Sequence, residues 1–347
     1  MTTTPPQTSR GLFLDAIAGR PTARRPLWVM RQAGRYLPEY RALREKYSFE
    51  QLSGDAELAA TVTMQPLARF PFDAAIIFAD LMSPVESLGL EVRFSPGPVL
   101  SSPVRTAADV SALRTPTREE IAPSVMAALR LVKRELGDSK ALLGFAGSPW
   151  SLAAYLVQGR GSPGFPALRA LAHSDPALLG TLLTKLTDLV IEYTHAQFEA
   201  GVDAVQLFDT WAGVLSLESW TRLVRPHVAR WLEATHTVGK PRILFLQDAS
   251  QLVAAHATLP SEALAVDWRE DLPALRRTVG AGKALQGNLD PAIMVAGPAA
   301  TRTAARALLS SMPALGHIVN LGHGITPEAQ IDSVHALVEV VHEERVS

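Results

Sequence analysis

The chain has 347 residues, of which 47% are hydrophobic and 19% are charged, and this composition is typical of a globular protein. Its 33 lysines and arginines nearly balance 34 aspartates and glutamates, so no general basic field exists that would bind nucleic acid or an anionic membrane. Cysteine is absent, which excludes disulfides, zinc–thiolate sites and a thiol nucleophile.

The sequence begins with ten mainly polar residues, MTTTPPQTSR, which we expect to form a disordered tail ahead of a single domain over residues 11–347. The tail lacks the apolar core of a signal peptide. No apolar run approaches the roughly 18 residues that are needed to span a bilayer. The sequence therefore predicts a cytoplasmic protein that does not associate with membranes.

Eight short apolar runs follow, and they alternate with longer amphipathic segments. Continuous apolar runs are typical of parallel strands that are buried on both faces. The runs are Pro26–Met30, Ala74–Phe78, Ala141–Phe145, Ala204–Phe208, Arg242–Leu246, Ala263–Val266, Lys283–Gln286 and His317–Leu321.

Helices are predicted between these runs, for example over residues 123–136, 176–200 and 217–237. Eight strands that alternate with helices predict an α/β fold, a single (β/α)8 TIM barrel, with a doubly wound open sheet as the structural alternative. The segment 91–100, EVRFSPGPVL, contains a Pro-Gly turn and predicts an extra β-hairpin inserted into the barrel.

Polar and glycine-rich clusters come directly after most of the predicted strands. The carboxyl ends of barrel strands form one face, so these clusters are expected to converge there. Ordinary loops would carry the same glycines and prolines, which leaves a purely structural interpretation open. The clusters are RQAGR, ADL, AGSPW, DTWAG, QDAS, DW, GNLDP and GHG.

The first cluster gathers fixed positive charge, because Arg31 and Arg35 are followed by Arg41 and Arg44. Arginine presents a planar fork of donors that fits carboxylates and phosphates. Arg31 follows a buried strand directly, which favours a ligand-binding role. The helical segment YRALREKY favours a plain helix charge for Arg41, which could pair with Glu45. The cluster predicts a local site for a ligand with several carboxylates or phosphates.

Asp80 lies at the end of the strand AAIIFA. A carboxylate at that position needs partners, which are either an arginine or a ligand that donates hydrogen bonds, since an ionised carboxylate only accepts them. Tyr155 lies in the helix after GFAGSPW and either projects into the barrel mouth or is an ordinary half-buried tyrosine.

The clusters FDTWAG and GHG offer three further candidates, Asp209, Thr210 and His323. A lone histidine is more often structural than catalytic, and the nine histidines show no metal-ligand spacing, so no metal site is predicted. The stretch GRGSPG formally matches a dinucleotide-binding motif, but it follows a helical segment in place of a strand, and we reject that interpretation.

Taken together, these clusters resemble the uroporphyrinogen decarboxylase family of haem biosynthesis. PLWVMRQAGRYLPEYR resembles its N-terminal signature, and GFAGSPWSLAAY resembles its second signature, with Ser151 where threonine is common. IIFADL, LFDTWAG, VDW, LQGNLDP and NLGHGITPE fit in the same order, over about residues 11–343. One stretch departs: the family often has lysine and glycine where this chain reads LQDASQLV, so the role of Gln247–Ser250 is left open.

The resemblance implies a single (β/α)8 barrel, usually a homodimer, with no metal or organic cofactor. The implied substrate is uroporphyrinogen III, whose four acetates lose CO2 and become methyls, giving coproporphyrinogen III. The positions that match the family's substrate-binding residues are Arg31, Gln32, Ala33, Arg35, Arg44, Asp80, Tyr155, Thr210 and His323, with Phe145 beside them.

The resemblance also implies roles for three catalytic residues. Asp80 would accept hydrogen bonds from the pyrrole N–H groups and stabilise a cationic ring. Arg31 would be the general acid or its positioning group, although a guanidinium is a poor acid near neutral pH. Tyr155 would hydrogen-bond an acetate or help to deliver a proton, and His323 would bind a propionate. Protonation makes a pyrrole ring its own electron sink, so the chemistry needs no organic cofactor.

Two other functions compete with this interpretation. One is a methyltransferase on the same barrel, in which histidine and cysteine hold zinc, but this chain has no cysteine. The other is a non-catalytic carrier of a tetrapyrrole or another polyanion, which would keep the arginines but would not need Asp80.

Overall fold

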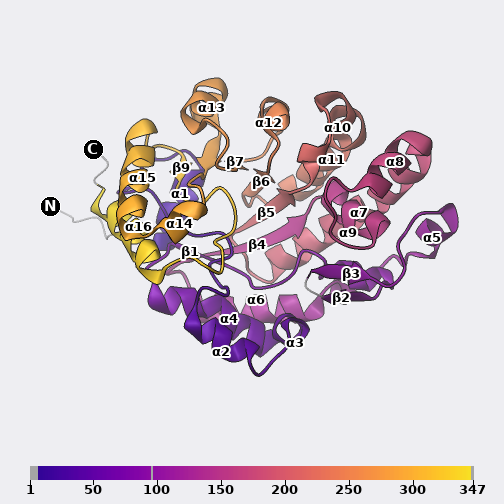
Figure 1. The fold of residues 1–347 in the computed structure, drawn as a ribbon, viewed down its shortest axis with the longest axis horizontal. Coiled ribbons are helices and arrows are strands. Elements are labelled where there is room, and N and C mark those ends of the chain that lie inside the picture. Colours follow the sequence, from indigo (N-terminus) through magenta and orange to yellow (C-terminus); the bar gives the residue numbers. More distant parts are fainter. Residues whose placement is uncertain (1–6, 95–96, 345–347) are drawn as a thin grey trace.

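The computed structural model describes residues 7–94 and 97–344. Its main sheet has seven parallel strands whose spatial order follows the chain, and helices surround the curved sheet (Figure 1). A doubly wound sheet would reverse its strand order at a switch point, so this order excludes that alternative. The strands are β1 (Ala74–Ile76), β4 (Ala141–Gly147), β5 (Ala204–Asp209), β6 (Arg242–Leu246), β7 (Ala263–Val266), β8 (Ala284–Gln286) and β9 (His317–Ile318).

The eighth position of the barrel is filled by the segment 26–30, which lies between β9 and β1. Leu27 makes a parallel bridge to Val319, and the Val319 amide donates to the Pro26 carbonyl at 2.9 Å. On the other side, the Asp73 amide donates to the Leu27 carbonyl at 2.8 Å. The Leu27 amide bonds to the Asp73 carboxylate and not to a neighbouring strand, so only a bridge forms here. The predicted barrel is confirmed, with its first strand reduced to this bridge.

The helices pack around the sheet, and most begin with a capping side chain or a proline in the first turn. The helix predicted at 123–136 is confirmed, and the one at 176–200 ends one residue early. The helix predicted at 217–237 is divided at Val224, because Pro226 cannot donate the hydrogen bond that would continue it. The helices are α1 (Ser9–Ile17), α2 (Pro38–Arg44), α3 (Phe49–Gly54), α4 (Ala56–Arg69), α5 (Ala107–Ala112), α6 (Pro123–Leu136), α7 (Pro149–Gln158), α8 (Pro166–Ser174), α9 (Pro176–Glu199), α10 (Leu217–Leu223), α11 (Arg225–His236), α12 (Ser250–Ala257), α13 (Leu272–Val279), α14 (Ala292–Ala296), α15 (Pro298–Ser311) and α16 (Ile331–Glu343).

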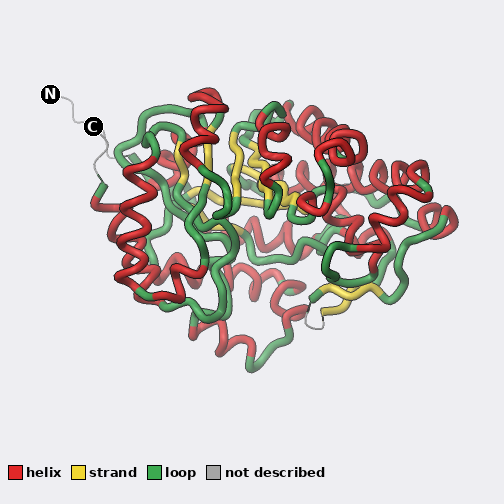
Figure 2. The backbone as a smooth tube through the Cα atoms, turned by 45° about the horizontal axis from the view of Figure 1, so that its top comes forward, coloured by secondary structure: helices red, strands yellow, loops and turns green. Residues whose placement is uncertain are grey.

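The predicted hairpin is confirmed as an antiparallel pair, β2 (Val92–Phe94) and β3 (Pro98–Leu100), which lies apart from the main sheet (Figure 2). Part of the Pro-Gly turn between the two strands lies outside the described residues. Of the predicted tail, residues 1–6 also lie outside them. Helix α1 begins at Ser9, two residues before the expected start of the domain, because Thr8 caps it by accepting from the Gly11 amide at 3.1 Å.

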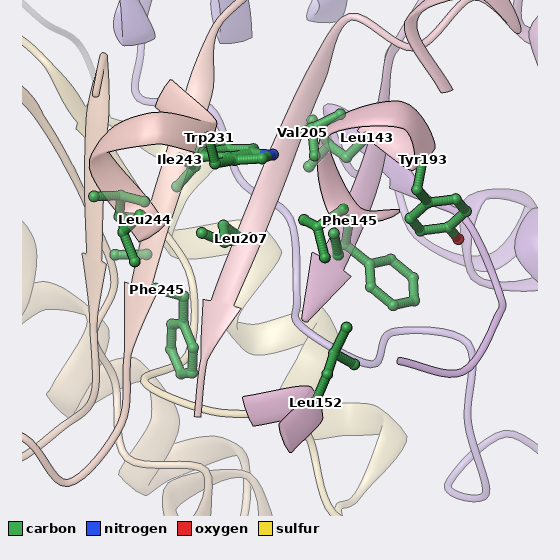
Figure 3. Close-up of a cluster of buried hydrophobic side chains, with 14 of the residues drawn as sticks. Leu143, Phe145, Leu152, Tyr193, Val205, Leu207, Trp231, Ile243, Leu244 and Phe245 are labelled. Atoms are coloured by element: carbon green, nitrogen blue, oxygen red, sulfur yellow. The ribbon is translucent and has the colours of Figure 1, made fainter. Parts of the chain in front are cut away.

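The hydrophobic core includes side chains from successive strands, among them Leu143, Val205 and Ile243 (Figure 3). A short polar chain crosses this core. Gln286 donates to the Gln206 side chain at 2.9 Å and accepts from the Trp28 indole at 3.0 Å. Buried polar groups of this kind are tolerated when they bond to one another.

Charged residues near the amino ends of the strands form the floor of the barrel, and they bond to backbone carbonyls. Lys283 donates to Leu259 and Ser261 at 2.6 and 2.9 Å, and Arg276 donates to Gly280, Lys283 and Gly316 at 2.7 Å. Lys283 and Arg276 therefore stabilise the fold through these bonds to the backbone. The opposite face, where the strands end, is the one on which barrel proteins carry their sites.

Candidate active site

The loop after the segment 26–30 is built around Gln32, whose side chain is fully buried. Its Oε1 accepts from the Val29 amide at 3.1 Å, and its Nε2 donates to the Ala74 carbonyl at 3.1 Å. Gln32 therefore holds the loop to the start of β1. Since both polar ends of the side chain are engaged, any ligand contact by Gln32 would have to come from its backbone.

Arg41 holds the same loop from its other side. Its Nη1 donates to the carbonyls of Arg35 and Tyr36 at 2.9 and 3.0 Å. Among the ion pairs of the described residues, none joins Arg41 to Glu45. Arg41 is an exposed residue of α2, as predicted, but its partners are carbonyls of the loop just before the helix and not Glu45.

Arg35 and Arg44 lie near the Tyr40 ring. Both are exposed, and both positive charges lower the pKa of the Tyr40 phenol, which burial raises. Arg44 Nη1 also donates to the Tyr47 carbonyl at 2.8 Å. Ala33, between these charges and Arg31, is partly buried.

Arg31 lies against the loop that follows β9. Its backbone has a φ of 61°, which is uncommon for a residue with a side chain. A Cβ atom on Gly324 would come within 2.7 Å of Arg31 Cγ and 2.9 Å of Nε, so the arginine side chain crosses the glycine backbone. The Ile325 amide donates to the Met30 carbonyl at 2.9 Å and ties the two loops together.

The surroundings of Arg31 are partly protein and partly solvent. Its side chain is exposed, yet burial lowers its pKa from the usual value, while Tyr155 and Asp80 act in the opposite direction. Arg31 therefore lies within electrostatic reach of Tyr155 and Asp80.

Asp80 lies near Arg31 and is partly buried. Its Oδ1 accepts from the Met82 amide at 2.8 Å, and its own amide donates to Ser83 Oγ at 3.2 Å. Burial raises the pKa of Asp80 to about 6, although the Met82 amide and Arg31 favour the charged form. Among the described residues, no ion pair within contact distance joins Asp80 to an arginine, and no protein donor reaches Oδ2. Oδ2 is therefore an acceptor that faces away from the protein's own donors.

Tyr155 extends from α7 toward these two residues. Its ring contacts Phe165 and Trp211 edge-on, with centroids 5.8 and 6.2 Å apart. Burial raises the pKa of the phenol, Asp80 raises it further, and Arg31 lowers it. The phenol is therefore protonated at neutral pH and lies within electrostatic reach of Asp80 and Arg31.

His323 is held between two glycines that allow close contact with neighbouring loops. A Cβ on Gly322 would come within 2.9 Å of Trp268 Cα, and Gly324 packs against Arg31 as described above. Burial lowers the pKa of His323 to about 4, and Arg31 and Arg269 lower it further while Asp267 opposes them. The imidazole is thus neutral at pH 7 and can donate one N–H.

Phe145 and Thr210 complete the set predicted from the sequence. Phe145 is buried, with its backbone held at both polar atoms by the Gln197 side chain at 2.9 and 3.0 Å. Thr210 is partly buried and follows β5. The preceding Asp209 is buried and accepts from the Ser148 hydroxyl and the Trp220 indole, so its carboxylate stabilises the loop.

Asp267, at the end of β7, connects several of these loops. Its carboxylate accepts from the Asp248 amide and from Arg269, and its carbonyl accepts from Asn288 Nδ2 at 2.7 Å. Asp248 has a φ of 48°, a conformation that glycine, asparagine and aspartate adopt most readily, and this fits the divergent stretch LQDASQLV.

Arg269 was not identified as a site residue from the sequence. It follows the quoted cluster DW by one position, and an arginine two residues beyond the buried Asp267 is the signal that could have found it. Within the described ranges, no group of three or more histidine, aspartate or glutamate side chains is placed to hold a metal ion. No helix in the described part of the chain is long and apolar enough to cross a membrane.

The fold and these side chains define a (β/α)8-barrel protein that carries arginines in the loop after its first strand, with Arg31 near Asp80 at the carboxyl ends of the strands. Residues 8–344 match the model of the family described as "Uroporphyrinogen decarboxylase (URO-D)". The chain belongs to the uroporphyrinogen decarboxylase family.

Curated relatives agree with this assignment over almost the whole chain. The uroporphyrinogen decarboxylase of Syntrophotalea carbinolica is 43% identical over 331 residues, which cover 95% of this chain and 96% of that protein. The uroporphyrinogen decarboxylase of Methylococcus capsulatus is 43% identical, with 95% and 97% covered.

Among solved structures, a methyltransferase from Methanosarcina mazei superposes with a TM-score of 0.84 at 19% identity, covering 97% of this chain and 98% of its own. A putative vitamin-B12-independent methionine synthase from Listeria monocytogenes gives a TM-score of 0.59 at 11% identity, with 92% and 96% covered. Likeness at this level of identity establishes a shared fold alone.

Proposed function

We propose that this protein is a carboxy-lyase that removes CO2 from the four acetate side chains of uroporphyrinogen III and forms coproporphyrinogen III in haem biosynthesis. The observation that carries the proposal is the proximity of Arg31 and Asp80 at the barrel mouth, where burial raises the pKa of Asp80 to about 6 and the nearby charge of Arg31 opposes that rise. Relatives that are 40–43% identical over 95% of the chain bear the name of this activity.

Substrate binding rests on the arginines at the mouth. The substrate carries eight carboxylates, and guanidinium groups bind carboxylates with charge-assisted, often bidentate hydrogen bonds. Arg31 lies beside Asp80, and the exposed Arg35 and Arg44 lie near Tyr40 on the same loop and the following helix. We assign Arg35 and Arg44 to outer carboxylates and Arg31 to an acetate near the reacting ring.

Asp80 is the acceptor for the tetrapyrrole. The pyrrole N–H groups converge toward the centre of the macrocycle, where the unpaired Oδ2 of Asp80 accepts from them. The reaction proceeds through protonation of a pyrrole carbon beside the carbon that bears the acetate, and the ring becomes cationic. A partly buried carboxylate stabilises that cation more strongly than water would, because little solvent screens the charges.

Decarboxylation then balances without a further electron acceptor. The C–CO2 bond breaks, and its electron pair neutralises the protonated ring and leaves a methylene group. A second proton adds to the methylene carbon to form the methyl, and the ring carbon releases the first proton. Each cycle therefore takes up one proton and releases one CO2. Burial lowers the pKa of Arg31 and makes it a stronger acid than a free guanidinium, which favours its use as a donor, while its place near Asp80 also suits it to position another donor.

The remaining residues position the substrate. The Tyr155 phenol, protonated at neutral pH, donates to an acetate oxygen, and the neutral His323 donates to a propionate. Phe145 offers an apolar wall beside the ring, Thr210 a hydroxyl, and the 32–33 backbone a further contact. Residues 11–347 act as one catalytic domain.

Two further expectations concern the oligomeric state and the location of the protein. From the resemblance to the family, we infer that it is a homodimer and that it lies in the cytoplasm. Light scattering during size-exclusion chromatography tests the first, since a dimer has twice the 37.3 kDa mass of the chain. A monomer at micromolar concentration would contradict it.

The activity is tested by anaerobic incubation of the purified protein with uroporphyrinogen III, without additives, and by chromatography of the porphyrins after oxidation. We expect the eight-carboxylate species to be converted to the four-carboxylate species. Binding without any loss of carboxylates would support a tetrapyrrole carrier and overturn the proposal.

A further inference from the structure

We propose that Arg269 binds a propionate carboxylate of the tetrapyrrole, and that Asp248 forms an ion pair with one edge of the Arg269 guanidinium while no substrate is bound. This inference rests on the proposed function and adds a binding residue from the loop after β7. The three observations that carry it are the position of Arg269, the orientation of its guanidinium and the weakness of its contact with Asp248.

The position of Arg269 follows from the packing of two loops. Trp268 lies against Gly322, whose Cβ would come within 2.9 Å of Trp268 Cα, so Arg269 is one residue from a direct contact with the GHG loop. Arg269 also lowers the pKa of His323, which follows Gly322. Arg269 therefore stands beside the residue to which we assign a propionate.

The guanidinium is held in one plane with part of its donors unused. Its Cζ lies 4.2 Å from the centre of the Trp268 ring, and its Nη1 bonds to the buried carboxylate of Asp267 at 3.0 Å. Among the described residues, no acceptor lies within hydrogen-bond distance of Nη2. An arginine that is fixed at one edge and open at the other is pre-organised for a planar carboxylate.

Asp248 makes the weaker of the two ion pairs. Its Oδ1 lies 3.5 Å from Arg269 Nε, and its side chain is 73% exposed, whereas the Asp267 side chain is 2% exposed. Exposed pairs at such distances contribute little to stability. A ligand carboxylate can therefore replace Asp248 without disturbing Asp267.

The carboxylate that we assign to Arg269 is a propionate, because Arg269 neighbours His323, to which we assign a propionate, and follows Trp268, which packs against Gly322 of the GHG loop. Propionates are the carboxylates that the reaction leaves in place, so a contact to one persists in the product.

The experiment measures binding of coproporphyrinogen III, which has four propionates and no acetates, by quenching of tryptophan fluorescence under anaerobic conditions. Arg269→Gln is expected to raise its dissociation constant about fivefold, the size of one partly exposed charge-assisted contact. Arg269→Lys is expected to fall between the wild type and Arg269→Gln, because lysine keeps the charge but not the planar fork. Arg302→Gln is the matched control, since Arg302 forms an exposed ion pair with Glu339 at 2.6 Å on the outer helices and is expected to change nothing.

Turnover of uroporphyrinogen III separates this inference from the function itself. We expect Arg269→Gln to raise KM by the same factor and to leave kcat within twofold. If the wild type decarboxylates its substrate but Arg269→Gln binds the product normally, the inference is overturned while the function stands. If Arg269→Gln weakens the binding of uroporphyrinogen III but not that of coproporphyrinogen III, the bound group is an acetate and the assignment is wrong. If the wild type neither binds nor turns over, the proposed function itself fails.

Discussion

The side chain of Arg31 crosses the backbone of Gly324, so that a Cβ on the glycine would come within 2.7 Å of Arg31 Cγ. These residues belong to the first and the last loop of the barrel mouth, and their contact places the guanidinium beside Asp80 and Tyr155. The position of Arg31 therefore depends on the absence of a side chain almost 300 residues away.

Gly324→Ala tests this relationship directly. The methyl group would displace the arginine, so we expect kcat/KM to fall at least tenfold while the fold is retained, because misplacement of a positioned group by about 1 Å can cost that much or more. Gly180→Ala is the control, since a Cβ at that helical position meets nothing within 4 Å. Full activity of Gly324→Ala would show that the position of Arg31 does not matter.

Arg31→Lys should be severely impaired, with kcat/KM lowered on the order of 100-fold, because an ammonium cannot replace the planar fork at the reacting carboxylate. Both side chains tolerate the φ of 61° equally, so folding is expected to be normal. Steady-state kinetics with uroporphyrinogen III provide the measurement, and kinetics equal to those of the wild type would rule out recognition by the fork.

Asp80→Asn should increase stability at alkaline pH. Burial raises the pKa of Asp80 to about 6, above its value of about 3.9 in the unfolded chain, so the folded protein binds this proton more tightly. Ionisation of Asp80 therefore lowers the free energy of unfolding. This loss is absent near pH 3.5 and complete above pH 6. We expect Asp80→Asn to raise the free energy of unfolding by about 1–2 kcal/mol at pH 8 and by little at pH 4. Urea unfolding at both values measures this, and a variant less stable than the wild type at pH 8 would contradict it.

The pH dependence of kcat/KM should show a limb near pH 6 that rises with pH, because Asp80 acts as an ionised acceptor. His323 has a pKa of about 4 and is therefore neutral across the pH range of that limb. His323→Gln should leave the limb in place while it lowers the affinity for the substrate. A limb that disappears in His323→Gln would assign it to the histidine. A wild-type profile that is flat between pH 5 and 7 would contradict the role of Asp80.

Much of the architecture could be predicted because buried parallel strands leave a simple apolar signal. The limits of that signal are visible at Leu27, where the apolar run was correct but the backbone amide bonds to the Asp73 carboxylate in place of a strand. Hydrophobicity reports burial and does not report the partner of an amide. The split of the helix at Val224 had a local signal in Pro226, which the periodicity concealed.

The site was harder to predict where a residue's partners are distant in the sequence. Gln32 has the chemistry of a ligand contact, but its side chain bonds to the backbone at Val29 and Ala74. Arg41 has the pattern of a surface helix charge, but carbonyls of the preceding loop satisfy it. Arg269 lay outside every motif, and only the packing of Trp268 on Gly322 brings it to the mouth.

The central claim is that Asp80 acts as the anionic acceptor in decarboxylation, and the most direct measurement compares wild type and Asp80→Asn in a single anaerobic time course with uroporphyrinogen III. Chromatography of the oxidised porphyrins counts the carboxylates that remain. We expect the wild type to reach the four-carboxylate product and Asp80→Asn, folded and able to bind, to be slower by at least about 100-fold, as for loss of a main electrostatic group. Turnover by Asp80→Asn within a few fold of the wild type would contradict the account.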